Sequence, residues 1–563
     1  MGKNFTVQFS RFRGSLLIIY AVIVFLSLPS GLIAQDDQIS ISLWEKVCRE
    51  IQDKYLDSVS EEQLVKWGID GMLTRLDPYN DFYTRDRIDQ LQSITTGEYE
   101  GIGTYLDRHD GKIIVTSPIE NSPASRAGIL PGDVILKIDD KNVTGLTVEE
   151  SSALVKGPRG STVTLTIERA GESNPLIFKI TREKIVIQDI PYWGTLTEGL
   201  GYVRLMHFSQ KAPEEMERVL KELKKKKITG LIMDLRGNPG GLLSAAVGVA
   251  DLFVKKGEII VSTRSHKTEY TNEHRARRDP VFPYLSLVVL VDHASASASE
   301  IVAGAIQDLD IGLILGHRTY GKGLVQTVLY PSITTAIKLT TAKYYTPSGR
   351  SIQGLIYHHD GFELTSVPAD STKEIFHTVG GRLVYGGGGI QPDIESPDSR
   401  WSALVLNLKK QSMFLQFAVS YVASHPDLTP VVRVNDNINT AFYEFLKEKH
   451  YSSQIEGAEK LSELIQIADS LALGEEPKKL LVEAQKYFMN QTIDRINPRD
   501  PGITYFLEQE INWVLDGERG KSSATIANDR EIQEAIALIT SPQKYQQYLR
   551  GQIVTKLPGL KNQ

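Results

Sequence analysis

Cysteine is nearly absent from this chain of 563 residues, and Cys48 is the only one. A single thiol excludes an internal disulfide and any metal site built from several cysteines. The chain also lacks a strong charge of either sign, because 63 basic and 69 acidic residues leave a formal net charge of −6. This near-neutral balance gives no overall attraction to nucleic acid or to an anionic membrane.

Several catalytic motifs are absent as well. No Gly-Lys-Ser/Thr follows the glycine-rich turn near residue 240, which argues against a phosphate-binding loop. The sequence contains no His-Glu-x-x-His and no Gly-x-Ser-x-Gly, so zinc proteases and hydrolases with a nucleophile elbow are disfavoured. The adjacent pair His358-His359 is more typical of a solvated loop than of a metal site. We therefore expect no metal and no cofactor.

What is present is an ordinary globular composition, with 41% hydrophobic and 23% charged residues. The length predicts three or four domains. Only seven of the 45 glycines lie beyond residue 400, where Glu, Lys, Leu and Gln dominate, so the tail is predicted to be helical. The predicted divisions are 1–34, a signal or anchor; 35–96, helical; 97–185, short strands; 186–400, alternating strands and helices; and 401–563, helical.

The N-terminus has the pattern of an export signal. Lys3, Arg11 and Arg13 precede an apolar run from Leu16 to Leu28, and small residues follow. The 20 residues from 15 to 34 are also just long enough to span a bilayer as an uncleaved anchor. Both alternatives place the rest of the chain outside the cytoplasm, in the periplasm or anchored facing it.

The run Lys224 to Lys227 invites a nucleic-acid interpretation. It closes a helix predicted to begin near Pro213, where cations complement the helix dipole. We interpret the run as a solvated helix end, and we expect no nucleic-acid partner.

The segment 122–138 contains Ser-Pro-Ala-Ser-Arg-Ala-Gly-Ile-Leu-Pro-Gly-Asp followed by an apolar strand. With Gly101-Ile102-Gly103 before it and a predicted helix over 147–155 after it, the region 97–185 resembles a PDZ domain. The two glycines let backbone N–H groups converge on the terminal carboxylate of a peptide. The extended peptide can then pair with the adjacent strand edge through main-chain hydrogen bonds. We therefore predict that residues 101–103 bind peptide C-termini.

Two strand–turn–helix units carry the candidate chemistry. Residues 230–241 run from an apolar strand into a turn ending in Gly240-Gly241, which can aim backbone N–H groups at an oxyanion. Residues 287–300 lead from a second strand into Ser-Ala-Ser-Ala-Ser-Glu and a helix. Three alternating serines exceed the needs of helix capping, and small neighbours leave room for a substrate to reach a nucleophile.

A serine nucleophile needs a base, and Lys322 lies between two glycines in the loop after the next strand. A lysine base must be neutral, so its pKa of about 10.4 has to be lowered by burial. Gln326 is positioned to hold the amine through its amide oxygen. From the residues alone, a structural role and a catalytic role for Lys322 are equally compatible with the sequence.

The ordered set of motifs resembles the C-terminal processing peptidases, also called tail-specific proteases, over roughly residues 40–400. The segments that carry the resemblance are the PDZ-like region; Asp-Leu-Arg-Gly-Asn-Pro-Gly-Gly at 234–241; Ser-Ala-Ser-Ala-Ser-Glu-Ile at 295–301; Tyr-Gly-Lys-Gly-Leu-Val-Gln at 320–326; Leu-Asp-Pro-Tyr at 76–79; 344–352; and 389–394. The resemblance implies an α/β protease core, ClpP/crotonase-like in the family, with an inserted PDZ-like β domain and flanking helical regions.

The resemblance also implies roles for single residues. The family's nucleophile, the middle serine of its string, corresponds to Ser297, and its lysine corresponds to Lys322, 25 residues later. Gln326 takes the lysine-orienting role, and Asp308 matches a helix aspartate that matters in some members. The oxyanion donors would be the backbone N–H groups of Ala298 and of Gly240 or Gly241. The expected substrates are proteins with apolar C-termini.

Three features depart from the family pattern. Lys156 stands where many members have an arginine that couples PDZ ligand binding to assembly of the active site. Residues 355–385 are inserted between two motifs, and the helical tail lies outside the core resemblance. For the tail, a dimer contact, adaptor docking and a wall around the active site all remain open.

Two other functions compete with this interpretation. A Ser–His–Asp hydrolase would use His293 and Asp234, but His293 lies on the strand end beside the serines, a poor direction for reaching their oxygens. A non-catalytic PDZ scaffold would explain the PDZ-like region, yet a scaffold needs none of Ser297, Lys322 and Gln326.

Overall fold

The computed structural model describes residues 39–109, 111–169, 171–357, 364–366, 374–397, 401–449, 451, 456–471, 474–489, 497 and 500–553. The predicted signal or anchor and the pair His358-His359 lie outside these residues. The chain divides into two compact units, one up to Arg75 and one from Leu76 onward. Among the described residues, no helix has both the length and the apolar character needed to cross a bilayer.

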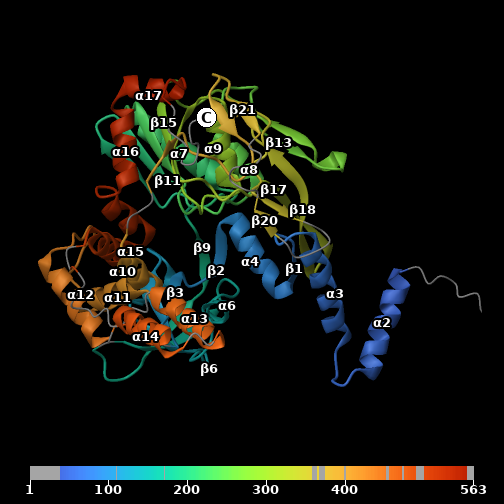
Figure 1. The fold of residues 1–563 in the computed structure, drawn as a ribbon, viewed down its shortest axis with the longest axis vertical. Coiled ribbons are helices and arrows are strands. Elements are labelled where there is room, and N and C mark those ends of the chain that lie inside the picture. Colours follow the sequence, from blue (N-terminus) through green and yellow to red (C-terminus); the bar gives the residue numbers. More distant parts are fainter. Residues whose placement is uncertain are drawn as a thin grey trace, which may run out of the picture. The chain divides into compact units, whose positions relative to one another are not determined.

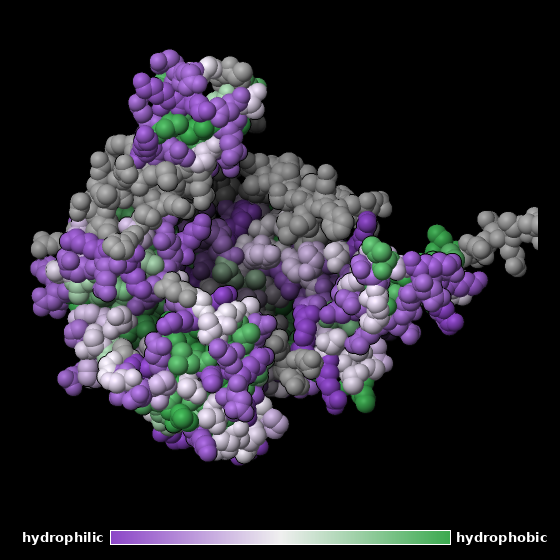
Figure 2. Space-filling view, turned by 90° about the horizontal axis from the view of Figure 1, so that it is seen from below, coloured by the Kyte–Doolittle hydropathy of each residue, from purple (hydrophilic) through white to green (hydrophobic). Residues whose placement is uncertain are grey.

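The first unit contains two helices, α2 (Ile41–Lys54) and α3 (Glu61–Leu76, whose last residue opens the second unit). Ser40 caps α2 by accepting a hydrogen bond from Leu43 N. The helical spacing of apolar residues predicted both helices, although α2 buries none of its side chains. Apolar residues are accordingly scattered over the surface of these helices, at the right of the view in Figure 2.

The candidate catalytic motifs of the second unit lie on a six-stranded sheet with the order β10-β11-β12-β15-β16-β23, of which β11 and β15 are labelled in Figure 1. β10 is antiparallel to its neighbour and the other pairs are parallel. The strands are β10 (Tyr192–Thr197), β11 (Leu200–Arg204), β12 (Gly230–Asp234), β15 (Ser286–Val291), β16 (Gly312–Gly316) and β23 (Ile394–Glu395). The central strands are buried along their whole length, as parallel strands covered on both faces must be.

One face of this sheet packs on α7 (Ala212–Lys225), α8 (Leu243–Ala250) and α9 (Ala298–Asp308) in the largest hydrophobic cluster. The run of lysines closes α7 as predicted, with Lys226 at the C-cap. The other face packs on α16 (Arg530–Ile539) through Ile532, Ala535 and Leu538, and on α17 (Pro542–Leu549) through Tyr545. Part of the C-terminal region, which the sequence placed outside the core resemblance, therefore completes the hydrophobic core of the sheet.

Tyr545 on α17 fixes this contact, because its hydroxyl bonds both the N–H (3.0 Å) and the C=O (2.9 Å) of Leu287 at the start of β15. We expect Tyr545→Phe to lower the free energy of unfolding by about 1–3 kcal/mol, since a buried backbone N–H loses its partner. Thermal and urea unfolding measure the change. The control Tyr548→Phe, on the same helix, should change stability by less than half as much; an equal effect would contradict the assignment.

A second sheet has the order β1-β18-β13-β14, with β17 paired to β18. Its strands are β1 (Asp81–Thr84), β13 (Ile259–Arg264), β14 (Asn272–Arg275), β17 (Leu324–Ser332) and β18 (Thr335–Tyr345). The segment 35–96 was predicted to be helical, but it contains β1 before α4 (Arg85–Thr96). β1 is stabilised by pairing with β18 about 250 residues away, which no local pattern reveals.

The PDZ-like region forms a sheet of order β3-β4-β5-β7-β8. The elements are β3 (Thr104–His109), β4 (Lys112–Pro118), α5 (Pro123–Ala127), β5 (Val134–Ile138), β6 (Lys141–Asn142), α6 (Val148–Val155), β7 (Thr162–Glu168) and β8 (Leu176–Thr181). The predicted helix is present, with Thr147 and Glu150 forming a capping box. β2 (Glu98–Gly101) and β9 (Glu183–Val186) pair where the chain enters and leaves this region.

The C-terminal region is helical, as predicted. Besides α16 and α17 it contains α10 (Ala403–Lys410), α11 (Met413–Ser424), α12 (Asp436–Glu448), α13 (Glu456–Ser470), α14 (Glu475–Met489) and α15 (Pro501–Thr525). Helices α10, α11, α12 and α15 share one hydrophobic cluster. The insertion at 355–385 contributes four short strands: β19 (Leu355–Tyr357), β20 (Leu364–Ser366), β21 (Ile375–His377) and β22 (Leu383–Tyr385).

Candidate active site

Parallel strands end at one edge of the sheet, so the segments that follow β12, β15 and β16 meet there. These segments are the glycine-rich turn, the serine string and the loop with Lys322. Asn238 joins the first two, because its carbonyl oxygen accepts hydrogen bonds from Ala296 N (3.1 Å) and from Ser299 Oγ (2.9 Å). Tyr320 N donates to Ser295 O (3.0 Å) and joins the lysine loop to the serine string.

Ser297 is half-buried and immediately precedes α9. Its φ of +55° and ψ of −109° lie in a region that non-glycine residues rarely adopt. Such a conformation costs of order 1–3 kcal/mol and persists only where surrounding contacts enforce it. Of the three serines, it is the only one in this conformation. Ser295 and Ser299 are buried and donate to the backbone oxygens of Leu235 and Asn238, so both have structural roles.

Glu300 connects the predicted nucleophile with the predicted base. Its Oε2 accepts hydrogen bonds from Ser297 N (2.8 Å) and Lys322 N (2.9 Å). Its Oε1 accepts from Thr319 Oγ1 (2.6 Å) and Gly321 N (2.7 Å). Complete burial raises the pKa of Glu300 to about 7, although these four hydrogen bonds favour the carboxylate.

Tyr344 on β18 makes a second connection. Its hydroxyl lies 3.1 Å from Ser297 O and is also within hydrogen-bond distance of Lys322 O. Burial raises the pKa of Tyr344 well above its ordinary value, so the hydroxyl stays protonated and can donate. The backbones of Ser297 and Lys322 are thus held together by the Glu300 carboxylate and the Tyr344 hydroxyl.

The Lys322 side chain is half-buried, and its Nζ lies 4.7 Å from the centre of the Tyr79 ring. Burial, followed by repulsion from Lys338, lowers the pKa of Lys322, while Asp77 and Glu300 act in the opposite direction. Asp77 and Tyr79 belong to the Leu-Asp-Pro-Tyr motif, which the sequence associated with the family without giving it a role. The direction of the pKa shift increases the neutral fraction that a general base requires.

Gln326 was predicted to orient Lys322. In the structure its Nε2 donates to Thr340 Oγ1 at 3.4 Å, and no hydrogen bond joins Gln326 to Lys322 in the described chain. A shift in the β17–β18 register lies between Val325 and Gln326. The structure therefore places Gln326 near the site without the predicted contact.

The backbone N–H of Ala298 and that of Gly240 or Gly241 were predicted to stabilise an oxyanion. Gly240 N already donates to Asn238 Oδ1 at 2.9 Å. Ala298 N and Gly241 N have no acceptor among the residues that the structure describes. A Cβ on Gly240 would lie 2.7 Å from Ala296 O and 2.9 Å from Ala298 N, so the glycine allows the turn to approach the start of α9.

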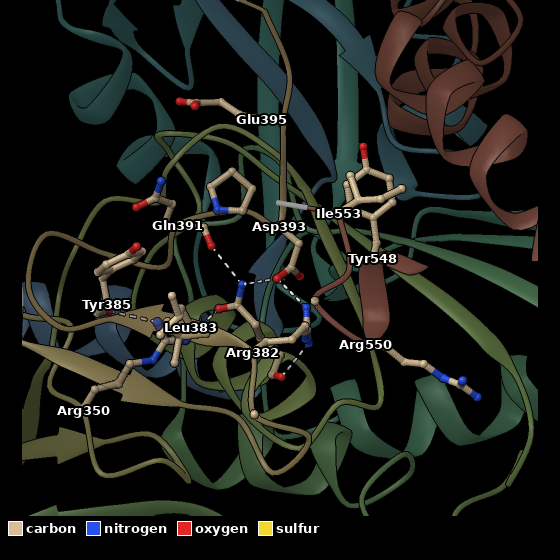
Figure 3. Close-up of a pocket in the computed structure, with 15 residues that line it drawn as sticks. Arg350, Arg382, Leu383, Tyr385, Gln391, Asp393, Glu395, Tyr548, Arg550 and Ile553 are labelled. Carbon is tan, nitrogen blue, oxygen red and sulfur yellow. Dashed lines mark hydrogen bonds and ion pairs between the residues drawn. The ribbon is translucent and has the colours of Figure 1, made fainter. Parts of the chain in front are cut away.

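Asp308 lies at the opposite end of α9 from Ser297, about 16 Å along the helix axis at about 1.5 Å per residue. It accepts hydrogen bonds from Arg350 (2.8 Å) and from Ser348 N (3.0 Å), so it anchors the 344–352 motif. Arg350 and Asp393, from two family motifs, line a pocket in which Arg382 pairs with Asp393 (Figure 3). The structure thus gives Asp308 a supporting role remote from Ser297.

His293 and Asp234, the residues of a rival Ser–His–Asp site, make other contacts. His293 is exposed and its ring stacks on His317 at 5.3 Å. Asp234 is buried and accepts hydrogen bonds from Tyr202, Arg204 and Arg236, and no hydrogen bond joins it to His293 in the described chain. In the parts of the chain that the structure describes, no group of acidic, histidine or cysteine side chains could hold a metal ion.

In the PDZ-like region, β3 lies at the edge of its sheet and packs beside α6. Within the described chain, Ile102 N and Gly103 N have no acceptor. Gly103 has a φ of +79°, and a Cβ there would lie 2.4 Å from the Ser122 side chain. Lys156 ends α6 with its Nζ 5.3 Å from the centre of the Tyr99 ring.

Comparison with known families agrees with this architecture. Residues 199–360 match the model of peptidase family S41, and residues 114–169 match a PDZ domain. Residues 404–539 match the model described as a probable PDZ-protease, C-terminal helical domain. Together with the fold, these matches define the class: a PDZ-containing serine-type peptidase.

Individual relatives specify the family. A carboxy-terminal-processing protease of Bartonella bacilliformis is 39% identical over 314 residues, which are 55% of this chain and 71% of the relative. Carboxy-terminal processing protease CtpA of Bacillus subtilis is 34% identical over 54% of this chain and 65% of its own. The chain belongs to the carboxy-terminal processing protease family of S41 peptidases, as its motifs predicted. Among solved structures, the photosystem II D1 C-terminal processing protease is 29% identical, covers 63% of this chain and 86% of its own, and has a TM-score of 0.35.

Glu300, Tyr344 and Tyr79 are the site residues that the sequence did not assign. Glu300 had a detectable signal, because a serine followed three residues later by glutamate at a helix start is the capping-box pattern. For Tyr344 and Tyr79 the sequence contained no signal beyond their membership in family motifs. Their contacts with Lys322 join segments that are distant in the sequence and are brought together by the fold.

Proposed function

We propose that this chain is an exported serine endopeptidase that captures the C-terminal tail of a protein substrate in its PDZ domain and cleaves it with a Ser297–Lys322 dyad. The observation that carries the proposal is the carboxylate of Glu300, which binds the backbone N–H groups of both residues. This shared buried acceptor holds the backbones of the two residues close together, and general-base catalysis depends on the proximity of nucleophile and base.

The proposed reaction begins with proton transfer. Neutral Lys322 accepts the hydroxyl proton of Ser297, and Oγ attacks the scissile carbonyl carbon. The resulting oxyanion lies against the N–H groups of Ala298 and Gly241. Collapse expels the amine product, which takes the proton from the Lys322 ammonium, and water then hydrolyses the acyl-enzyme ester. The steps require no metal and no cofactor.

For the tail, we propose an extended peptide added to the open edge of β3, with its terminal carboxylate at Ile102 N and Gly103 N. Ile102 is buried among the apolar side chains of the PDZ core, including Val155 at the end of α6. An uncharged, apolar last residue suits this environment, because burying an unpaired charge is costly. Lys156, half-buried beside the loop, adds a cation near the carboxylate.

The proposal is tested with purified protein and an unfolded substrate that ends in apolar residues. We expect cleavage, and we expect kcat/KM to fall about tenfold or more when the last two residues are replaced by aspartate or the carboxylate is amidated. Mass spectrometry of the products and initial rates measure both effects. Absence of any cleavage contradicts the peptidase proposal, whereas equal rates for all three tails contradict only tail recognition.

A further inference from the structure

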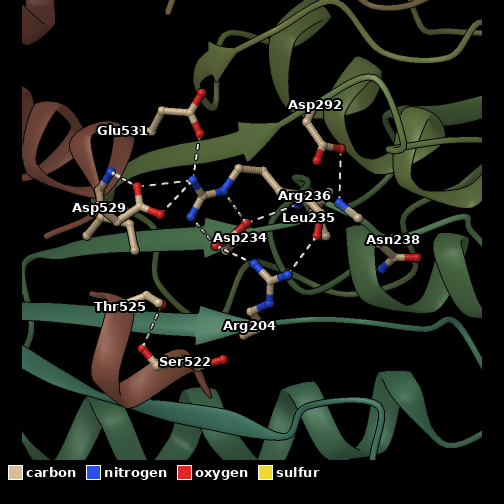
Figure 4. Close-up of polar contacts among 12 residues, drawn as sticks. Arg204, Asp234, Leu235, Arg236, Asn238, Asp292, Ser522, Thr525, Asp529 and Glu531 are labelled. Atoms are coloured by element: carbon tan, nitrogen blue, oxygen red, sulfur yellow. Dashed lines mark hydrogen bonds and ion pairs between the residues drawn. The ribbon is translucent and has the colours of Figure 1, made fainter. Parts of the chain in front are cut away.

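An ion cluster joins the C-terminal helix α16 to the glycine-rich turn beside Ser297 (Figure 4). Arg236, two residues after β12, donates through Nη1 to Asp529 Oδ1 (3.1 Å) and to Glu531 Oε2 (2.5 Å). Through Nε and Nη2 it donates to the two oxygens of Asp234 at 3.0 and 2.7 Å. One guanidinium therefore bridges the end of a core strand and the start of a helix nearly 300 residues later.

The cluster is shielded from solvent. The side chains of Arg236 and Glu531 are each 14% exposed, and that of Asp529 is 8% exposed. Burial alone would raise the pKa of Asp234, but Arg204 and Arg236 hold it well below its ordinary value. Arg204 also donates to Arg236 O (3.0 Å), so the backbone at Arg236 is fixed as well as its side chain.

Hydrogen bonds of the two residues after Arg236 connect it to the candidate site. Gly237 N donates to Asp292 Oδ1 (2.9 Å), and the same oxygen accepts Ser295 N (3.0 Å). The next residue, Asn238, carries the carbonyl that binds Ala296 and Ser299, and its side chain holds Gly240 N. Three residues separate the ion cluster from the glycines that face the start of α9.

The acidic residues of α16 do more than attach the helix. Apolar contacts of Ile532, Ala535 and Leu538 already bury α16 against the sheet. Replacing a buried ion pair by apolar contacts is often neutral or stabilising, so attachment of α16 does not by itself account for this cluster. Asp529 is also the N-cap of α16, since its Oδ1 accepts Ile532 N (3.0 Å), which fixes the start of the helix at the guanidinium.

We propose that Glu531 and Asp529 are positioning residues for catalysis: through Arg236 they hold the glycine-rich turn in the geometry that presents the Gly241 N–H to the oxyanion. The C-terminal helical region thereby acts on the chemical step, in addition to completing the core. This inference rests on the proposed function.

The test compares three variants of the full chain. Glu531→Gln removes one charge from Arg236 and keeps the side-chain size. The double variant Asp529→Ser/Glu531→Gln removes both acidic charges of α16 from Arg236, and a serine at 529 can still cap the helix. Glu534→Gln is the matched control, because it makes the same change on the same helix with no contact to Arg236 in the described structure. Each is assayed for kcat, KM, melting temperature and affinity for a peptide aldehyde that forms a tetrahedral adduct with serine.

We expect kcat to fall about tenfold for Glu531→Gln and about 100-fold for the double variant, with KM changed less than threefold. Aldehyde affinity should fall in parallel with kcat, since the adduct also places an oxyanion at the turn. Glu534→Gln should match the wild type.

Three outcomes overturn the inference: unchanged kcat in the double variant, a loss confined to KM, or a loss of kcat that follows the unfolded fraction while aldehyde affinity of the folded protein stays constant. The proposed function is judged separately by wild-type cleavage. If the wild type cleaves and Ser297→Ala does not, a normal double variant contradicts only the role of α16.

Discussion

Ser297→Ala and Lys322→Ala are each expected to reduce cleavage by at least about 10⁴-fold while the protein stays folded. Alanine at 297 removes the oxygen that attacks the carbonyl. Alanine at 322 removes the amine that the proposed mechanism uses as the general base. Initial rates with an unfolded substrate and an apolar tail measure the loss, and circular dichroism checks the fold.

Lys343→Ala is the matched control for the lysine. Lys343 is exposed on β18 and pairs in register with Leu324, two residues after Lys322. We expect this variant to retain the wild-type rate. If wild type, Ser297→Ala and Lys322→Ala all cleave equally, the assignment of the dyad is wrong; if none cleaves, the peptidase activity itself is in question.

The pH profile follows from the environment of Lys322. Because burial and Lys338 lower its pKa, the neutral form becomes populated at lower pH than for a free lysine. Activity should therefore rise with pH, with an apparent pKa well below about 10.4. Rates measured from about pH 5 to 9 test this, and a flat profile over that range argues against a lysine base.

Glu300→Gln is expected to lower kcat by about 100-fold, equivalent to roughly 2.7 kcal/mol of transition-state stabilisation. The wild-type carboxylate accepts two hydrogen bonds at each oxygen. A glutamine has one oxygen and one NH₂ group, so two of these four donors would face another donor. Whichever way the amide is oriented, two of the hydrogen bonds that join the Ser297 turn to the Lys322 loop are lost.

Stability measurements distinguish this effect from a general loss of structure. The folded-state pKa of Glu300, about 7, lies above its ordinary value of 4.5. The folded state therefore binds the proton more tightly, and the contribution of this group to the unfolding free energy decreases as pH rises from about 4.5 to about 7. Glu300→Gln should lack that decrease.

Glu222→Gln makes the same chemical change on α7, where the side chain is 41% exposed and pairs with Lys225. It should retain the wild-type kcat and the wild-type pH dependence of unfolding. A Glu300→Gln enzyme with normal kcat would show that the shared carboxylate does not set the geometry of the dyad.

The PDZ-like region and the protease core could be predicted from sequence because their signals are local. The alternation of residues 163–167, the Thr147 cap and the turn glycines each act within a few residues, and the structure contains the corresponding strand and helix. The α/β core was equally visible, since the buried strands β12, β15 and β16 are continuous apolar runs bounded by glycine or polar residues.

Other features depend on contacts that no local pattern specifies. β1 exists because it pairs with β18, and α16 covers the sheet because its apolar face meets strands that precede it by more than 200 residues. Gln326 donates to Thr340, and the shift in β17–β18 register beside it is a feature that the motif does not encode.

The sequence by itself determined the scarcity of cysteine and of net charge, the order of the motifs and, through those motifs, the family. The resemblance to that family then implied Ser297 and Lys322 as the candidate nucleophile and base. Only the tertiary structure showed that Glu300 and Tyr344 hold the two backbones together, that Asp308 lies at the far end of α9, and that Arg236 ties the glycine-rich turn to the C-terminal helix. The physical reason is that hydrogen bonds, burial and lowered pKa values arise between segments brought together by the fold, whereas a motif records only neighbours along the chain.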